Sequence, residues 1–254
     1  MEFNSIESTI LEKAITDSGW QVSSITNKDE YICSNSYFSE LATIKKLDNS
    51  RFGLNFRREL NSADFIKEAE KLPKENEFYI FTAADSWNAT NLLRRAAELY
   101  SVMPDNPLNE YQKKIKELSN SEIQKTEADR LVKERVGQDI YRNALIKYWQ
   151  GSCAVTGCTL NDALRASHAK PWKDCSSDAE RLNVYNGFLL TANLDALFDK
   201  GYISFTDEGL IMISSTLEHS DLKGLGLSPN MKLRWLEEPH KEFLKYHREH
   251  IWKN

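Results

Sequence analysis

The spacing of hydrophobic residues in the first hundred positions predicts a small mixed unit of helices and strands. Strands are predicted where short β-like runs occur, at residues 20–25, 40–47, 51–56 and 77–81. Helical spacing occurs at residues 6–15 and 86–102, the second helix beginning at Asp85 or Ser86, and an amphipathic stretch covers residues 62–72. This unit is a candidate recognition or regulatory module.

A break follows at Met103-Pro104-Asp105-Asn106-Pro107, where two prolines bracket turn-forming residues. A proline disfavours helical backbone at the residue before it, so we expect a domain boundary at residue 105. Residues 108–148 are rich in Lys, Glu, Gln and Leu and contain no proline, which predicts one or two long polar helices. Within them, the run Gln112-Lys113-Lys114 is typical of a solvent-facing surface.

Beyond Gly151 the pattern changes to short strands and turns. A brief helix is predicted at residues 192–200, a hairpin at 202–213 and a last helix at 238–252. The expected fold class is therefore α+β. It comprises a mixed α/β module at residues 1–105, a helical connector at 106–148 and a C-terminal domain at 149–254.

Composition and charge narrow the class of protein. With 41% hydrophobic and 28% charged residues, the chain is in the range of folded globular proteins rather than disordered ones. It lacks the roughly 20 apolar residues of a membrane span and the features of a signal peptide, so we expect a cytoplasmic protein without membrane contact. The four cysteines show no paired spacing, which favours reduced thiols over disulfides or four-sulfur zinc coordination.

The net charge of -5 argues against indiscriminate binding to polyanions. Between residues 129 and 174, however, eight Lys or Arg stand against five acids. This local excess permits a surface that faces DNA.

Chemistry-bearing residues are concentrated in four short segments of the C-terminal domain. These are Cys153-Ala-Val-Thr-Gly157, Ala166-Ser-His-Ala-Lys-Pro-Trp172, Asn186-Gly-Phe-Leu-Leu190 and Leu194-Asp-Ala-Leu-Phe-Asp199. Residues i and i+4 share a helix face, so Asp195 and Asp199 can point at one metal ion while the neighbouring apolar side chains turn to the core. Gly201 suits the left-handed cap that ends a short helix.

In order and spacing these segments resemble the HNH endonucleases, specifically the branch found in bacterial restriction and defence nucleases. The resemblance spans about residues 136–213 and implies a ββα-metal site of two strands and a helix. His168 matches the histidine that ends the first strand, and Asn186 matches the asparagine that begins the second. Nine residues after it, Asp195 replaces the family's third signature residue, a histidine, and Asp199 matches a further helix ligand of some members.

The resemblance implies metal-dependent hydrolysis of phosphodiester bonds in DNA, in restriction or anti-phage defence. His168 would be the general base that activates water, and Asn186 would hold the loop and keep the imidazole aimed and in the needed tautomer. Asp195 and Asp199 would ligate the metal. Many members carry a further metal ligand at the position of Ser167, so Ser167 is the third residue of the candidate metal site, and water can take its place. Because carboxylates are hard ligands, we expect Mg²⁺ or Mn²⁺.

The nearest basic candidates for phosphate contact are Arg165, Lys170, Lys173 and Arg181. Trp172 is expected to anchor its loop, and His247 and His250 to have a surface or docking role. The expected partners are DNA and either a second copy of the chain or a defence-system protein. Two other functions stay open, namely a nucleic-acid-binding or partner-binding protein without turnover, and an RNase or toxin effector.

Overall fold

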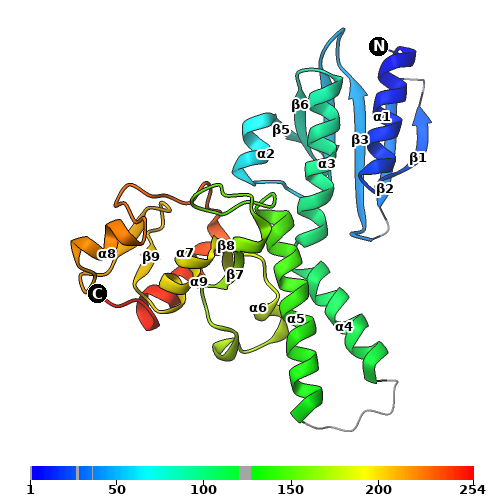
Figure 1. The fold of residues 1–254 in the computed structure, drawn as a ribbon. Coiled ribbons are helices and arrows are strands. Elements are labelled where there is room, and N and C mark those ends of the chain that lie inside the picture. Colours follow the sequence, from blue (N-terminus) through cyan, green and yellow to red (C-terminus); the bar gives the residue numbers. More distant parts are fainter. Residues whose placement is uncertain (1, 27–28, 36, 120–126) are drawn as a thin grey trace. The chain divides into compact units, whose positions relative to one another are not determined.

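The computed structural model describes residues 2–26, 29–35, 37–119 and 127–254 of the chain. They form two compact units, Met1–Ser101 and Val102–Asn254 (Figure 1). Residues 120–126 of the predicted polar helices lie outside the described residues. No helix in the described part is both long and apolar enough to cross a membrane.

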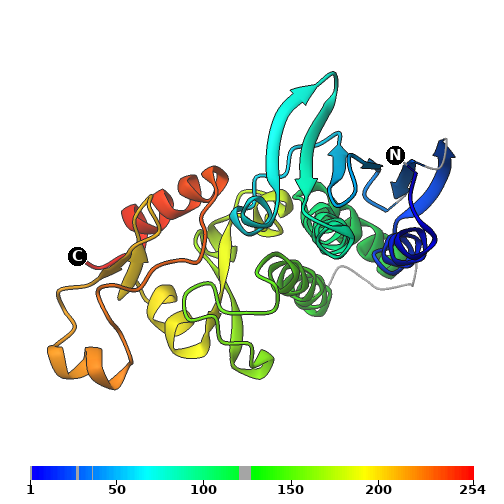
Figure 2. The same cartoon turned by 90° about the horizontal axis from the view of Figure 1, so that it is seen from above.

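The first unit is a six-stranded antiparallel sheet with helices on one face (Figure 1, Figure 2). The strand order is β1-β2-β3-β4-β6-β5, with β1 (Gln21–Thr26), β2 (Glu30–Asn35), β3 (Glu40–Lys46), β4 (Phe52–Phe56), β5 (Glu70–Glu75) and β6 (Phe78–Ala83). The helices are α1 (Ser5–Asp17), α2 (Ala63–Glu68) and α3 (Ser86–Val102). Aromatic rings fill the core beneath the helices, among them Trp20, Phe56, Phe81 and Tyr100.

Most predicted elements of this unit are confirmed, and two differ. The amphipathic stretch at 62–72 is helical only to Glu68, after which the chain turns into the edge strand β5. This strand is exposed and rich in Lys and Glu, so it carries no apolar alternation that a sequence could reveal. The strand β2 was not predicted, although Tyr31 and Cys33 alternate inward along it.

The second unit begins with two helices, α4 (Asp105–Ser119) and α5 (Glu127–Tyr148). Pro107 lies in the first turn of α4, where a missing backbone N–H costs no helical hydrogen bond. The helix α5 packs on the strands β7 (Leu164–His168) and β8 (Gly187–Thr191). The division into module, connector and C-terminal domain stays a prediction, but residues 106–148 belong to the same compact unit as the strands that follow.

The remaining elements surround these two strands. They are α6 (Asp178–Arg181), α7 (Ala192–Asp199), β9 (Ile203–Phe205), β10 (Ile211–Ile213), α8 (His219–Gly224) and α9 (Glu238–His250), with single 3-10 turns at Asn161–Ala163 and Trp172–Asp174. The predicted helix at 192–200, the hairpin and the last helix are thus confirmed. Leu194, Leu197 and Phe198 of α7 are buried as expected, each apolar side chain of this size contributing about 1.5–3 kcal/mol.

Candidate active site

Two strands and a helix form the expected ββα arrangement. The strands β7 and β8 pair antiparallel with His168 opposite Gly187, and α7 follows β8 directly. The helix packs against both strands. His168 therefore ends the first strand, while Asp195 and Asp199 project from the helix that returns across the sheet.

The imidazole of His168 is held in one tautomer. Its Nε2 atom lies 2.8 Å from the backbone carbonyl oxygen of Arg181. A carbonyl only accepts hydrogen bonds, so Nε2 carries the hydrogen and Nδ1 of the neutral ring is unprotonated. Burial lowers the pKa of His168 to about 4, an effect that the Arg181 carbonyl opposes. At neutral pH the ring is therefore uncharged and has a free lone pair on Nδ1.

Two aromatic rings fix the plane of this imidazole. Tyr141 of α5 stacks on it with ring centroids 3.8 Å apart and an interplanar angle of 20°, and Trp172 meets it edge-on at 5.6 Å. Trp172 is half-buried and packs on α5 at Gly137, where a Cβ atom would lie 2.6 Å from the indole. Trp172 is thus a loop anchor, as expected. Tyr141 was not recognised from the sequence, although Gly137 and Tyr141 share one helix face.

Asn186 is fully buried and holds the loop between the two strands. Its Oδ1 atom accepts a hydrogen bond of 2.8 Å from the Lys170 backbone N–H, and its Nδ2 donates to the carbonyls of Lys170 and Glu180 at 3.2 Å. The tautomer of His168 is set by the hydrogen bond that its Nε2–H donates to the Arg181 carbonyl, and Asn186 makes no hydrogen bond to the imidazole. Asn186 therefore acts on the imidazole indirectly, through the loop that carries this carbonyl and through its own carbonyl, which accepts from the Tyr141 hydroxyl.

The two carboxylates of α7 are associated with the buried hydroxyl of Ser167. Ser167 Oγ donates to Asp199 Oδ1 at 3.3 Å, and the Ser167 hydroxyl also opposes the rise in the pKa of Asp195. Desolvation of the carboxyl group raises the pKa of Asp195. The pKa of Asp199 is raised to about 6 by desolvation and then by the charge of Asp195. Neither carboxylate forms an ion pair with a described residue, so no cationic side chain competes with a metal ion for Asp195 or Asp199.

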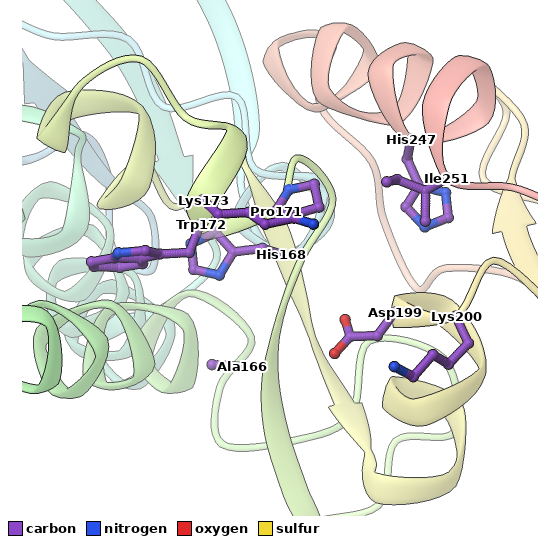
Figure 3. A pocket seen from close by; sticks show the side chains of 9 residues that line it. All are labelled: Ala166, His168, Pro171, Trp172, Lys173, Asp199, Lys200, His247 and Ile251. Carbon is purple, nitrogen blue, oxygen red and sulfur yellow. The ribbon is translucent and has the colours of Figure 1, made fainter. Parts of the chain in front are cut away.

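His168 and Asp199 lie on opposite walls of a cavity of about 340 Å³ (Figure 3). The other lining residues come from β7, the 171–173 segment, the end of α7 and α9, and they are Ala166, Pro171, Trp172, Lys173, Lys200, His247 and Ile251. Among the described residues, no three His, Cys, Asp or Glu side chains cluster as metal ligands. Asp199 lines the cavity, whereas Asp195, one turn earlier on α7, is not among the lining residues.

Residues 153–206 match the HNH endonuclease family. The chain contains an HNH domain. This HNH domain implies nuclease activity and a nucleic-acid substrate. No curated protein matches the chain. The matched residues include β7, β8 and α7, whereas α5 and α9, which also contribute side chains to the site, lie outside them.

The four predicted phosphate contacts of the HNH domain differ in their surroundings. Lys170 Nζ bonds both carboxylate oxygens of Glu180, at 2.9 and 3.0 Å. The guanidinium of Arg181 donates to the carbonyls of Trp172 and Cys175 and to Asp178. Arg165 is exposed, although its Nη1 donates to the carbonyls of Asp162 and Leu164.

Lys173 is exposed and lines the cavity. Lys200, which was not predicted from the sequence, lines it too, and its charge opposes the rise in the pKa of Asp199. Its position directly after Asp199 in the sequence could have identified it as a residue of the site. Lys173 and Lys200 thus bring positive charge to opposite sides of the cavity (Figure 3).

The expected surface role of His247 is wrong. His247 is 1% exposed and lies in the core of the second unit against Phe198, whereas His250 is exposed. His240 is fully buried as well. The apolar residues Phe243 and Leu244 define the buried face of α9, and His240 and His247 lie one turn before and after them on that face.

Proposed function

We propose that the chain is a metal-dependent DNA endonuclease that hydrolyses phosphodiester bonds. The observation that carries this proposal is the position of His168 opposite Asp199 across one cavity, with the unprotonated Nδ1 of His168 as a proton acceptor. The HNH match supports the reaction class, and the finer assignment of residues is our own.

Asp195 and Asp199 are the residues that would hold Mg²⁺ or Mn²⁺, and Ser167 would orient Asp199 through its hydroxyl, with water completing the coordination. When bound, the ion would stabilise the negative charge that develops on the leaving 3′ oxygen. Lys173 and Lys200 would contact the adjoining phosphates of the substrate, because both line the cavity. Arg165 would contact a phosphate beside Asp195, because its charge is close enough to oppose the rise in the pKa of that carboxyl group. The internal contacts of Lys170 and Arg181 favour a role in shaping the loop.

His168 would take the proton of the attacking water at Nδ1 and become positively charged. Its Nε2–H already donates to the Arg181 carbonyl, which stabilises that charge without any movement of the ring. Tyr141 and Trp172 keep the ring plane fixed during the transfer. Such a general base contributes about 10²–10⁴-fold to the rate.

The setting that we propose is restriction or anti-phage defence in the cytoplasm, with the first unit as the recognition or regulatory module. This part rests on the sequence resemblance. One HNH site cuts one strand, so double-strand cleavage requires a homodimer, a defence-system partner or two successive events.

Nicking of supercoiled plasmid tests the proposal. The unchanged chain is expected to nick DNA with Mg²⁺ or Mn²⁺ and to lose activity with a chelator. His168→Ala should reduce the rate by about 10²–10⁴-fold. The exposed His250 provides the control, because His250→Ala removes an imidazole outside the cavity and should leave the rate unchanged. Full activity of His168→Ala would refute the assignment.

Two further outcomes identify the alternatives. A parallel assay with RNA of the same sequence separates a DNA endonuclease from an RNase or toxin effector, since only the latter would cut RNA preferentially. Binding of DNA with no metal-dependent nicking would favour the function without turnover.

A further inference from the structure

His247 of the C-terminal helix α9 contacts the backbone of α7 next to Asp199, the proposed metal ligand. The Nε2 atom of His247 lies 2.9 Å from the carbonyl oxygen of Phe198, the residue that precedes Asp199. Because a carbonyl only accepts, Nε2 carries the hydrogen. The hydroxyl of Ser204 lies 3.0 Å from Nδ1 and donates to it. Both ring nitrogens are therefore used, and His247 has a single orientation.

The last turn of α7 is fixed by further contacts with α9 and the residues after it. The His247 ring stacks on the Phe198 ring at 3.9 Å with an interplanar angle of 1°. Gly201 follows α7 with a φ of 73°, and a Cβ atom there would lie 2.0 Å from the Ile251 carbonyl oxygen. The backbone N–H of Lys253 donates to the Gly201 carbonyl at 2.8 Å.

These contacts matter because α7 has only eight residues and Asp199 is the last of them. The final turn of a helix frays readily, and a short helix derives its stability mainly from tertiary packing. The orientation of the Asp199 carboxylate depends on the backbone at Phe198 and Asp199. A free last turn would spread that carboxylate over several positions relative to Asp195 and His168.

We propose that His247 is a positioning residue that holds Asp199 in its metal-binding orientation, so that α9 is an integral part of the metal site. The proposal rests on the function proposed above, in which Asp199 ligates the ion. It goes beyond the residues that match the HNH family, since α9 lies outside 153–206. His247 acts through the Phe198 backbone and needs no contact with metal or substrate.

The test is Mn²⁺ binding to the full chain without nucleic acid, measured by isothermal titration calorimetry. His247→Phe keeps a ring that can stack on Phe198 but removes the donor to the Phe198 carbonyl. We expect it to weaken Mn²⁺ binding about 10-fold or more, the range found when a group that orients a metal ligand is removed. His247→Gln, whose amide nitrogen can replace Nε2 as donor, should restore part of the affinity.

Arg248→Ala is the matched control in the same helix. Arg248 ties α9 to the Phe205 carbonyl and to Asp207, at 2.8 and 2.7 Å, and both of these partners lie outside α7. We expect this variant to unfold more easily than the unchanged chain and to bind Mn²⁺ with unchanged affinity. Chemical denaturation of every variant gives the loss of stability against which the affinities are compared.

The outcomes distinguish failure of the positioning role of His247 from failure of the proposed metal site. Equal weakening of Mn²⁺ binding by His247→Phe and Arg248→Ala, or no weakening by His247→Phe, would overturn the inference. If Asp199→Ala still abolishes Mn²⁺ binding in that case, the proposed metal site stands. Failure of the unchanged chain to bind Mn²⁺, or unchanged binding by Asp199→Ala, would refute the metal site and the inference together.

Discussion

Tyr141 offers a quantitative test of how the general base is oriented. Its ring is 1% exposed and stacks on His168, while its hydroxyl donates to the Asn186 carbonyl at 2.9 Å. Tyr141→Phe removes only the hydroxyl. The Asn186 carbonyl keeps the hydrogen bond that it accepts from the Ala169 N–H at 3.0 Å, so no buried acceptor is left without a partner. The expected loss of stability is about 0.5–1.5 kcal/mol, with the rate of cleavage unchanged.

Tyr141→Leu removes the ring as well. An aromatic pair contributes about 0.5–1.5 kcal/mol beyond the area that it buries, and this is the energy that holds the imidazole in its plane. If about 1 kcal/mol of orientational preference is lost, kcat should fall about fivefold, because 1.36 kcal/mol corresponds to a factor of ten. The altered shape should also cost about 1–3 kcal/mol of folding stability.

The assay is single-turnover cleavage of a duplex at saturating Mg²⁺, at a temperature where urea denaturation shows all variants to be folded. We expect the rate of cleavage to depend on the ring of Tyr141 alone. The folding stability should depend on both the ring and the hydroxyl. It is refuted if Tyr141→Leu cleaves at the unchanged rate, or if Tyr141→Phe loses as much activity as Tyr141→Leu.

Two further predictions follow from Gly187 and Asp199. Gly187→Ala would bring a Cβ atom to 2.0 Å from the Ser167 carbonyl oxygen and 2.2 Å from the Tyr141 hydroxyl, so thermal denaturation should show a loss of at least about 1–3 kcal/mol. Gly224→Ala, which meets no atom within 4 Å, should be close to neutral. Cleavage at limiting Mg²⁺ should fall below about pH 6, where Asp199 takes up a proton, whereas His168 with a pKa of about 4 stays unprotonated there. Because metal and proton compete for the Asp199 carboxylate, added Mg²⁺ should move the pH at which cleavage falls to a lower value. If that pH does not change with Mg²⁺, Asp199 is not the metal ligand.

The parts of the site that the sequence predicts are those encoded over a short stretch of chain. Asp195 and Asp199 are four residues apart on one helix, and that helix follows directly on a strand that pairs with the one ending in His168. Spacing places the two aspartates on one helix face, whereas the resemblance to the HNH endonucleases identified His168 and joined it to that helix. The edge strand β5 shows the converse, since its exposed Lys and Glu residues carry no pattern and only pairing with β6 makes them a strand.

The remaining parts depend on tertiary packing or on backbone atoms. The carbonyl of Arg181 fixes the His168 tautomer, and every residue has such a carbonyl, so no side-chain motif reveals it. Tyr141 reaches His168 from a helix that precedes β7, and only the packing of α5 on the strands brings the rings together. His247 was misjudged because α9 is a polar helix, although its spacing from Phe243 and Leu244 already places it on the buried face.

Two buried histidines of the second unit have similarly lowered pKa values and different chemistry. Burial lowers the pKa of both His168 and His247 to about 4, and each donates its Nε2–H to a backbone carbonyl. The difference is at Nδ1. In His247 this atom accepts a hydrogen bond from the buried Ser204 hydroxyl, so its lone pair is occupied. In His168 Nδ1 has no hydrogen-bond partner among the described residues, and the ring lines the cavity opposite Asp199. A depressed pKa is therefore insufficient to identify a general base here. His168 is singled out because its ring lines the cavity and its Nδ1 has no hydrogen-bond partner among the described residues.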